Sequence, residues 1–183
     1  MTGVEYRVMR FTNIALAALM LSVTAGSVQA ATTATATLTI NVTFTQPTCK
    51  IEMPASYNLG FLTPGETKSH GDLNITWKCE GNTPVKTALA ATIVTGTANG
   101  NEKVNLVTGG GQDTGAALSL REKNTGNPIK LTGLAAKDYF CADPNEMAPD
   151  LMRTCTLTPV TEVARQGALG RASATLRFEV DYP

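Results

Sequence analysis

Residues 34–45 read ATATLTINVTFT, and this stretch decides how the rest of the sequence is interpreted. Every even position from Ala34 to Phe44 is apolar, whereas every odd position is Thr or Asn. Because side chains alternate between the faces of a strand, the pattern predicts one apolar face along roughly 35 Å, at about 3.3 Å per residue. Pro47 ends the pattern just before Cys49. Two interpretations remain open: an ordinary first strand of the domain, or a strand that is given to another molecule.

The other end of the sequence carries a matching pattern. After Gly170 the odd positions are polar, and the even positions are apolar: Ala172, Ala174, Leu176, Phe178, Val180 and Tyr182. An amphipathic last strand by itself is common in sandwich domains. Two alternating strands at opposite ends of one chain are a more specific combination.

Composition limits the classes of function. The chain has 183 residues, a length that favours one domain after any leader is removed. It carries 15 basic and 15 acidic side chains, which argues against nucleic-acid binding because a basic patch or a high pI is expected there. His70 is the single histidine, so a histidine-based metal site or catalytic apparatus is a poor hypothesis. We find no catalytic motif and predict a non-enzyme without metal or cofactor.

The first thirty residues have the features of an export signal. Arg7 and Arg10 precede the apolar run 14–23, and Val28-Gln29-Ala30 follows as a small-residue cleavage motif. The apolar run is too short and too rich in Ala and Ser for a membrane anchor. We predict a signal peptide over residues 1–30 and a mature chain over 31–183.

Four cysteines remain in that mature chain: Cys49, Cys79, Cys141 and Cys155. An even number after an export signal predicts two disulfides. Three connectivities are available, of which pairing between sequence neighbours is the simplest. A zinc site is the weaker alternative, because the sequence contains no C-x-x-C pair and an oxidising compartment disfavours thiolates.

Short β-rich runs alternate with turn clusters through the rest of the chain, and this spacing predicts a β-sandwich. The expected strands cover residues 73–79, 85–94, 104–107, 116–121, 128–131, 153–163 and 172–182. Trp77 shares a face with Leu73 and Ile75, which predicts a core position. His70 is expected in an exposed loop, and residues 143–150 in a loop near the second cysteine pair.

Taken together, these features resemble the fimbrial (pilus) subunits of the bacterial chaperone–usher pathway. Five of them carry the resemblance: the alternating segment before the first cysteine; Cys49 and Cys79 about thirty residues apart with LGFLTPGE at 59–66 between them; the strand 116–120 running into 124–129; Gly170, fourteenth from the last residue; and the penultimate Tyr182. They extend over nearly the whole mature chain, and the set is specific although no single member is.

The resemblance implies an all-β fold: an incomplete immunoglobulin-like sandwich that a donated strand completes. It divides the chain into the signal peptide 1–30, an N-terminal donor-strand extension 31–45 and a pilin domain 46–183. The donor side chains would be Ala36, Leu38, Ile40, Val42 and Phe44. The groove that receives a chaperone strand or a donor strand would involve Gly170, Ala174, Leu176, Phe178, Val180 and Tyr182.

The function implied is that of a structural subunit exported through the periplasm to a surface fimbria. Its partners would be a periplasmic chaperone, an outer-membrane usher and other fimbrial subunits, in a homo- or heteropolymer. Two alternatives stay open: a minor, adaptor or tip-associated subunit that binds a host glycan or protein receptor, or a self-complete secreted binding domain. The sequence departs from the family at Val42, where Gly is frequent, and in its second cysteine pair.

Overall fold

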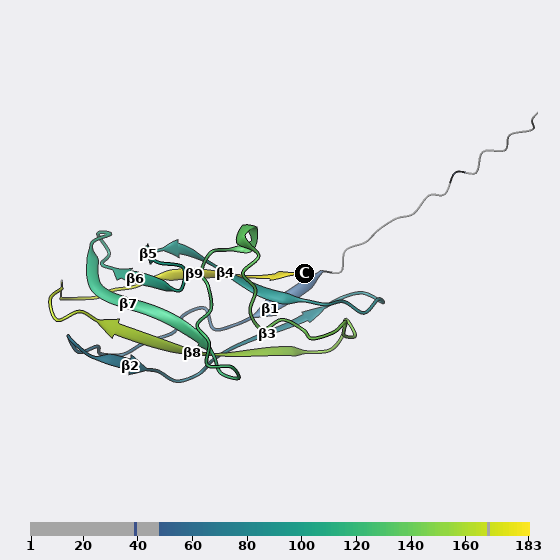
Figure 1. The fold of residues 1–183 in the computed structure, drawn as a ribbon, viewed down its shortest axis with the longest axis horizontal. Helices are drawn as coiled ribbons and strands as arrows, with labels where there is room; N and C mark the ends of the chain where they lie inside the picture. The colour runs from purple at the N-terminus through teal and green to yellow at the C-terminus, as the bar shows by residue number, and fades with distance from the viewer. Residues whose placement is uncertain (1–38, 40–47, 168) are drawn as a thin grey trace, which may run out of the picture. The chain divides into compact units, whose positions relative to one another are not determined.

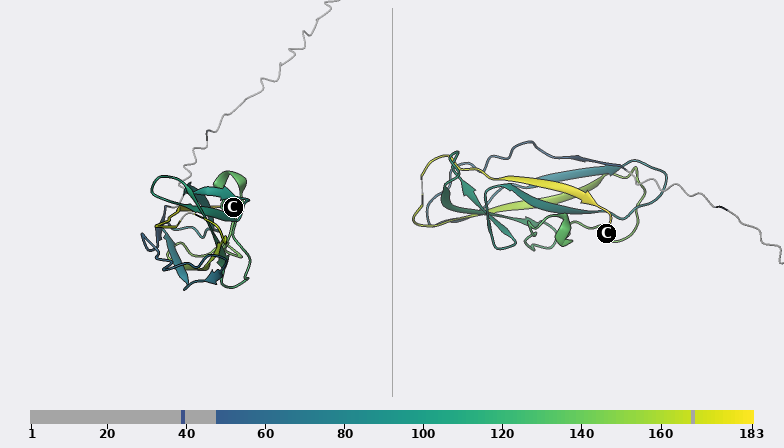
Figure 2. Two further views of the ribbon diagram at one scale, coloured as in Figure 1. Left: turned by 90° about the vertical axis from the view of Figure 1, so that its left-hand side faces the viewer. Right: turned by 90° about the horizontal axis from the view of Figure 1, so that it is seen from above.

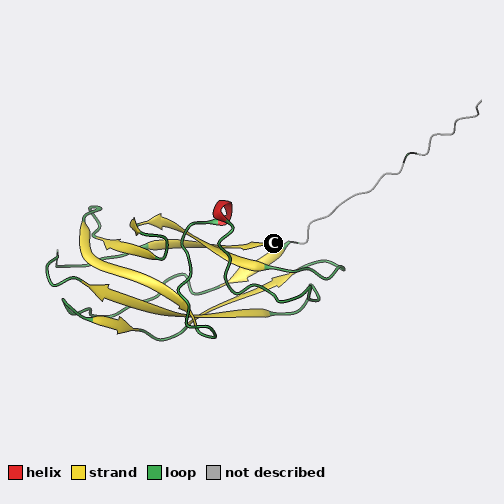
Figure 3. Cartoon of the chain, in the orientation of Figure 1, coloured by secondary structure: helices red, strands yellow, loops and turns green. Residues whose placement is uncertain are grey.

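The computed structural model describes residues 39, 48–167 and 169–183, and these fold almost entirely as strands and loops (Figures 1 and 3). Among them one short 3-10 helix occurs, η1 (Leu134–Ala136). The predicted signal peptide and the five predicted donor side chains lie outside the described residues. No helix of the described part is long and apolar enough to cross a bilayer.

The described residues form nine strands in two antiparallel sheets. Their bounds are β1 (Cys49–Glu52), β2 (Thr67–Ser69), β3 (Leu73–Cys79), β4 (Ala88–Thr95), β5 (Thr97–Asn99), β6 (Lys103–Val107), β7 (Asp113–Glu122), β8 (Arg153–Val163) and β9 (Thr175–Asp181). The larger sheet has the order β1-β3-β8-β7-β6-β5, and β2 pairs with β8 beyond the end of β3. β4 and β9 form the second sheet, and the strands surround a common interior (Figure 2, left). The expectation of an all-β sandwich is confirmed.

The two most regular strands have the bounds that the sequence predicts. β3 alternates between buried and more exposed residues along its whole length, and β8 alternates in the same way from Arg153 to Leu157. Ile75 and Leu157 have no exposed surface, and Trp77 is 2% exposed, as expected for a core residue. These side chains form the centre of the core, where apolar burial supplies most of the stabilisation.

The predicted strands 104–107 and 116–121 are longer in the structure, as β6 and β7, and three others differ for identifiable reasons. The last strand begins at Thr175 instead of residue 172, because Ser173 still pairs with Val107 of the larger sheet before the chain crosses over. β4 begins at Ala88 instead of residue 85, since the preceding residues pair with the loop before β8. The expected strand 128–131 is absent: a single bridge joins Pro128 to Arg121, and proline cannot donate to a ladder.

His70 is a further correction. It was expected in an exposed loop, but it is partly buried, and its Nε2 lies 2.8 Å from Thr161 Oγ1. It follows β2, which holds it against β8. Partial burial, reinforced by the nearby Lys68 charge, lowers the pKa of its imidazole.

Both disulfides form between sequence neighbours. Cys49–Cys79 joins β1 to β3 at positions that are directly opposite in the ladder. Cys141–Cys155 joins the loop before β8 to β8 itself. Of the three connectivities that the sequence left open, the structure therefore has the simplest.

Candidate functional site

The two-stranded sheet has one covered edge and one open edge. The outer edge of β4 is covered by the segment between β7 and β8, through bridges that join Val85 to Met147, Leu89 to Phe140 and Thr92 to Thr132. β9 pairs with β4 on one side, and within the described residues no strand pairs with its other side. An edge strand of this kind presents backbone donors and acceptors that can pair with a further strand.

The inward side chains of β9 are also incompletely covered. Leu176, Phe178 and Val180 pack against the core, yet each of them keeps part of its surface exposed. The Phe178 ring lies edge-on to Phe140, with ring centroids 6.3 Å apart. The inward residues of β3, by contrast, are fully buried. The core is therefore open along β9.

The predicted groove residues divide into two groups. Ala174, Leu176, Phe178 and Val180 all pack against the core cluster, so the structure brings them together. Gly170 lies before the crossover, is exposed and has a φ of +136°, a conformation that favours glycine. The side chains predicted to fill this groove lie outside the described residues.

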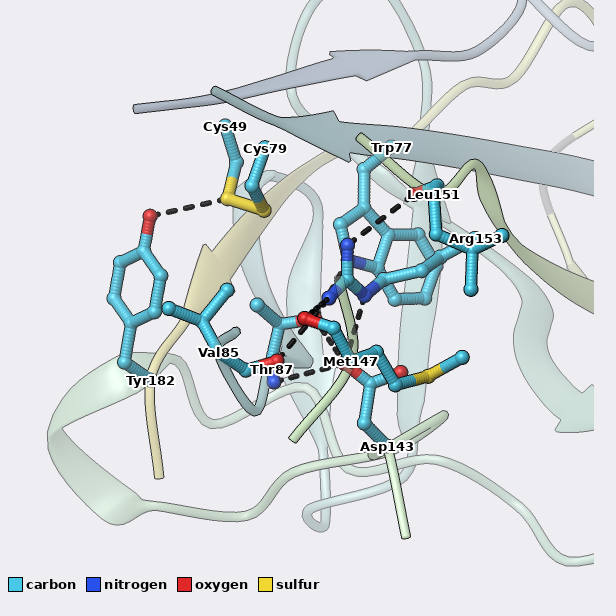
Figure 4. Close-up of a disulfide and its surroundings, with 10 residues drawn as sticks. All are labelled: Cys49, Trp77, Cys79, Val85, Thr87, Asp143, Met147, Leu151, Arg153 and Tyr182. Atoms are coloured by element: carbon cyan, nitrogen blue, oxygen red, sulfur yellow. Dashed lines mark hydrogen bonds and ion pairs between the residues drawn. A yellow bond between two sulfur atoms is a disulfide. The ribbon is translucent and has the colours of Figure 1, made fainter. Parts of the chain in front are cut away.

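Tyr182 closes this edge at its C-terminal end. Its hydroxyl lies 3.0 Å from Cys49 Sγ (Figure 4), so the end of the last strand meets the start of β1. Partial burial raises the pKa of this hydroxyl. Beside it, the Tyr139 hydroxyl donates to Asp181 Oδ2 at 2.6 Å and lowers the pKa of that carboxyl, helped by the Tyr182 backbone N–H.

A buried polar network lies below the first disulfide (Figure 4), and sequence reasoning missed it. Asp143 Oδ2 accepts from Arg153 Nε at 2.8 Å, from the Thr87 backbone N–H at 3.0 Å and from the Thr87 hydroxyl at 2.7 Å. The indole N–H of Trp77 donates to the same hydroxyl at 2.8 Å, and Arg153 Nη2 donates to the Val85 carbonyl at 3.1 Å. The signal was weak, because an aspartate in a loop and an arginine at the start of a strand are ordinary.

A second surface feature is a polar cleft of about 620 Å³ beside β5, β6 and β7. Its side chains bond to one another: Asn99 Nδ2 donates to Asn105 Oδ1 at 2.9 Å, and Asn105 Nδ2 to Asp113 Oδ2 at 2.7 Å. Because the side chains satisfy each other, the cleft shows no specific ligand site. In the part of the chain that the structure describes, no three His, Cys, Asp or Glu residues could hold a metal ion.

Comparison with known proteins gives a likeness at the level of the fold. No protein-family model matches the sequence, and no curated protein matches it. A crystal structure of the P pilus rod subunit PapA is similar, with a TM-score of 0.54 and 20% sequence identity. The match covers 74% of this chain and 99% of the PapA chain. The fold is thus an immunoglobulin-like pilin fold.

Proposed function

We propose that this protein is a structural subunit of a surface fimbria and polymerises by donation of its N-terminal strand. Residues 31–45 of one subunit would occupy the open edge of β9 in the next. A periplasmic chaperone would fill the same edge until an outer-membrane usher brings the subunits together. The chain would pass through the periplasm after loss of residues 1–30.

One observation carries this proposal: within the described residues, β9 has an unpaired edge and a partly exposed apolar face on the same strand. An added strand would supply main-chain hydrogen bonds to that edge and apolar side chains to that face. Segment 34–44 has the required pattern, with an apolar side chain at every second residue. Sharing a fold with a pilus rod subunit supports the same conclusion.

The apolar burial available from a donated strand is large on the scale of domain stability. Burying Leu38, Ile40, Val42 and Phe44 at about 1.5–3 kcal/mol each gives about 6–12 kcal/mol as an upper bound. Domains are commonly stable by only about 5–15 kcal/mol. Occupation of the β9 edge would therefore change the free energy of unfolding by an amount comparable to the stability of the whole domain. A chaperone that fills this edge before assembly would protect the subunit from that loss.

The test uses the mature chain with residues 31–45 removed and a synthetic peptide that covers 32–45. Thermal unfolding is recorded with and without the peptide, and with a control peptide in which Ile40 and Val42 are replaced by Asn. We expect the wild-type peptide to raise the unfolding temperature steeply and the control to have little effect.

Two other outcomes have clear meanings. A shortened chain that is stable and ignores the peptide, together with a monomeric mature chain, would refute the proposal in favour of a self-complete binding domain. A shortened chain that is unstable and ignores only this peptide would indicate a minor subunit that awaits a different donor strand.

A further inference from the structure

The loop between the cysteines of the second disulfide carries two exposed apolar side chains. Leu151 is 45% exposed and Met152 is 54% exposed. We propose that these two residues form a contact surface for a second copy of this chain, the copy that receives the N-terminal strand. The inference rests on the proposed function, and it names a contact outside the β9 edge.

Strand register places this surface beside the point where the N-terminal segment leaves the domain. Cys49 lies opposite Cys79 in the β1–β3 ladder, and Trp77 lies opposite Arg153 in the β3–β8 ladder. Beyond the end of this ladder the Cys79 N–H donates to the Pro149 carbonyl at 3.2 Å, so the bend that carries Leu151 and Met152 begins beside Cys79. Cys49 lies on the other side of β3, and neighbouring strands are about 4.8 Å apart, so the start of this bend is on the order of 10 Å from Cys49.

The short connection to the donor segment brings the receiving copy close to this surface. Only Gln46, Pro47 and Thr48 separate Thr45 from Cys49. At about 3.3–3.6 Å per residue, the chain from Thr45 to Cys49 spans at most about 14 Å. A copy that holds the donor strand up to Thr45 would therefore lie close to Cys49, within reach of the bend that carries Leu151 and Met152.

The loop is held in place before any partner arrives. The Cys141–Cys155 disulfide closes it, the buried Asp143–Arg153 ion pair crosses it, and the Cys79 N–H donates to the Pro149 carbonyl at 3.2 Å. A surface held this firmly loses little conformational freedom when it binds. A role in assembly thus accounts for a second disulfide around a loop that exposes apolar side chains.

The receiving copy exposes apolar side chains near the corresponding end of β9. Each strand pair within the described residues is antiparallel, and we assign the same direction to a strand added at β9. Its C-terminal end would then lie beside Thr175, where β9 begins. Leu169, six residues earlier, is 87% exposed, and Val94, next to the Thr95 that pairs with Thr175, is 51% exposed. The Leu151–Met152 surface would meet this end of the receiving copy.

Assembly of the mature chain, followed by sedimentation over a range of concentrations, tests the inference. We expect the double variant Leu151→Ser/Met152→Ser to need a roughly tenfold or higher concentration for half-maximal assembly, because apolar area is lost from the contact. The matched control Leu151→Met/Met152→Leu keeps that area and should assemble like wild type. The urea midpoint of each variant, measured on the unassembled chain, should stay unchanged, since both residues are half exposed.

A photoreactive benzoyl-phenylalanine at position 152 gives an independent readout. On irradiation of assembled chains it should crosslink to the region of residues 94 and 169 of another copy. Normal assembly of the Ser variant, or crosslinks confined to one copy, would overturn the inference. The chain lacking 31–45 separates failure of strand donation from failure of the Leu151–Met152 contact. If this shortened chain assembles like the mature chain, strand donation is wrong and the inference fails with it. The same holds if the mature chain does not assemble at all.

Discussion

Replacing Asp143 with alanine should lower the free energy of unfolding by about 3–5 kcal/mol. Arg153 is only 3% exposed, so its guanidinium would keep a charge inside the domain after losing its carboxylate partner at 2.8 Å. The buried Thr87 N–H would lose its acceptor as well. Because the whole domain is expected to be stable by about 5–15 kcal/mol, this loss is a large share of the total.

Equilibrium unfolding in urea measures this loss. Trp77 is the single tryptophan and bonds to Thr87, so its fluorescence reports on the network directly. With a slope of about 2 kcal/mol per molar urea, the midpoint should fall by about 1.5–2.5 M. Asp150→Ala is the matched control, because its ion pair with Lys78 is largely exposed and should contribute at most about 1 kcal/mol.

The double variant Asp143→Ala/Arg153→Met decides whether the pair is coupled. Removing both charges leaves no uncompensated ion. The free energy of unfolding of the double variant should therefore fall by clearly less than the sum of the decreases for Asp143→Ala and Arg153→Met alone. Additive losses, or a loss below about 1 kcal/mol for Asp143→Ala alone, would refute the reasoning.

Three further effects are expected. Replacing Cys141 and Cys155 with Ser should lower the free energy of unfolding, measured in urea, by about 3 kcal/mol. The disulfide closes a short loop and so reduces the conformational freedom of the unfolded chain. Tyr139→Phe should make the free energy of unfolding fall less steeply as the pH is lowered. The Tyr139 hydroxyl lowers the pKa of the Asp181 carboxyl in the folded state, so this carboxylate stabilises the fold at pH values above its ordinary pKa of 3.8. The contribution is lost as the pH falls through the lower folded-state pKa. Gly167→Ala should lower the thermal midpoint, because its Cβ would collide with a backbone carbonyl of β7.

The sequence predicted strands correctly where apolar and polar residues alternate along a single strand. Residues 73–79 and 153–163 became strands with the predicted bounds, because a half-buried strand must alternate. It missed the short edge strands β1, β2 and β5, which have three or four residues and too few side chains to show a period.

The candidate site was predictable only in part. The apolar alternation of the last strand was visible, but its open edge depends on which strand lies beside it, and that is a property of the sheet. The Asp143–Arg153 pair was not visible, because its partners come together through the folding of the 141–155 loop. The exposure of Leu151 and Met152 likewise follows from that loop's path.

The position of the first disulfide has a mechanical consequence. β1 has four residues, and a pull on Thr48 would otherwise unzip its ladder one pair at a time, beginning at Cys49. Because the bridge to Cys79 is at that first pair, tension passes by a covalent bond into β3, which lies inside the larger sheet. A force applied at Thr48 would therefore load the seven-stranded sheet and leave the short β1 ladder unstretched.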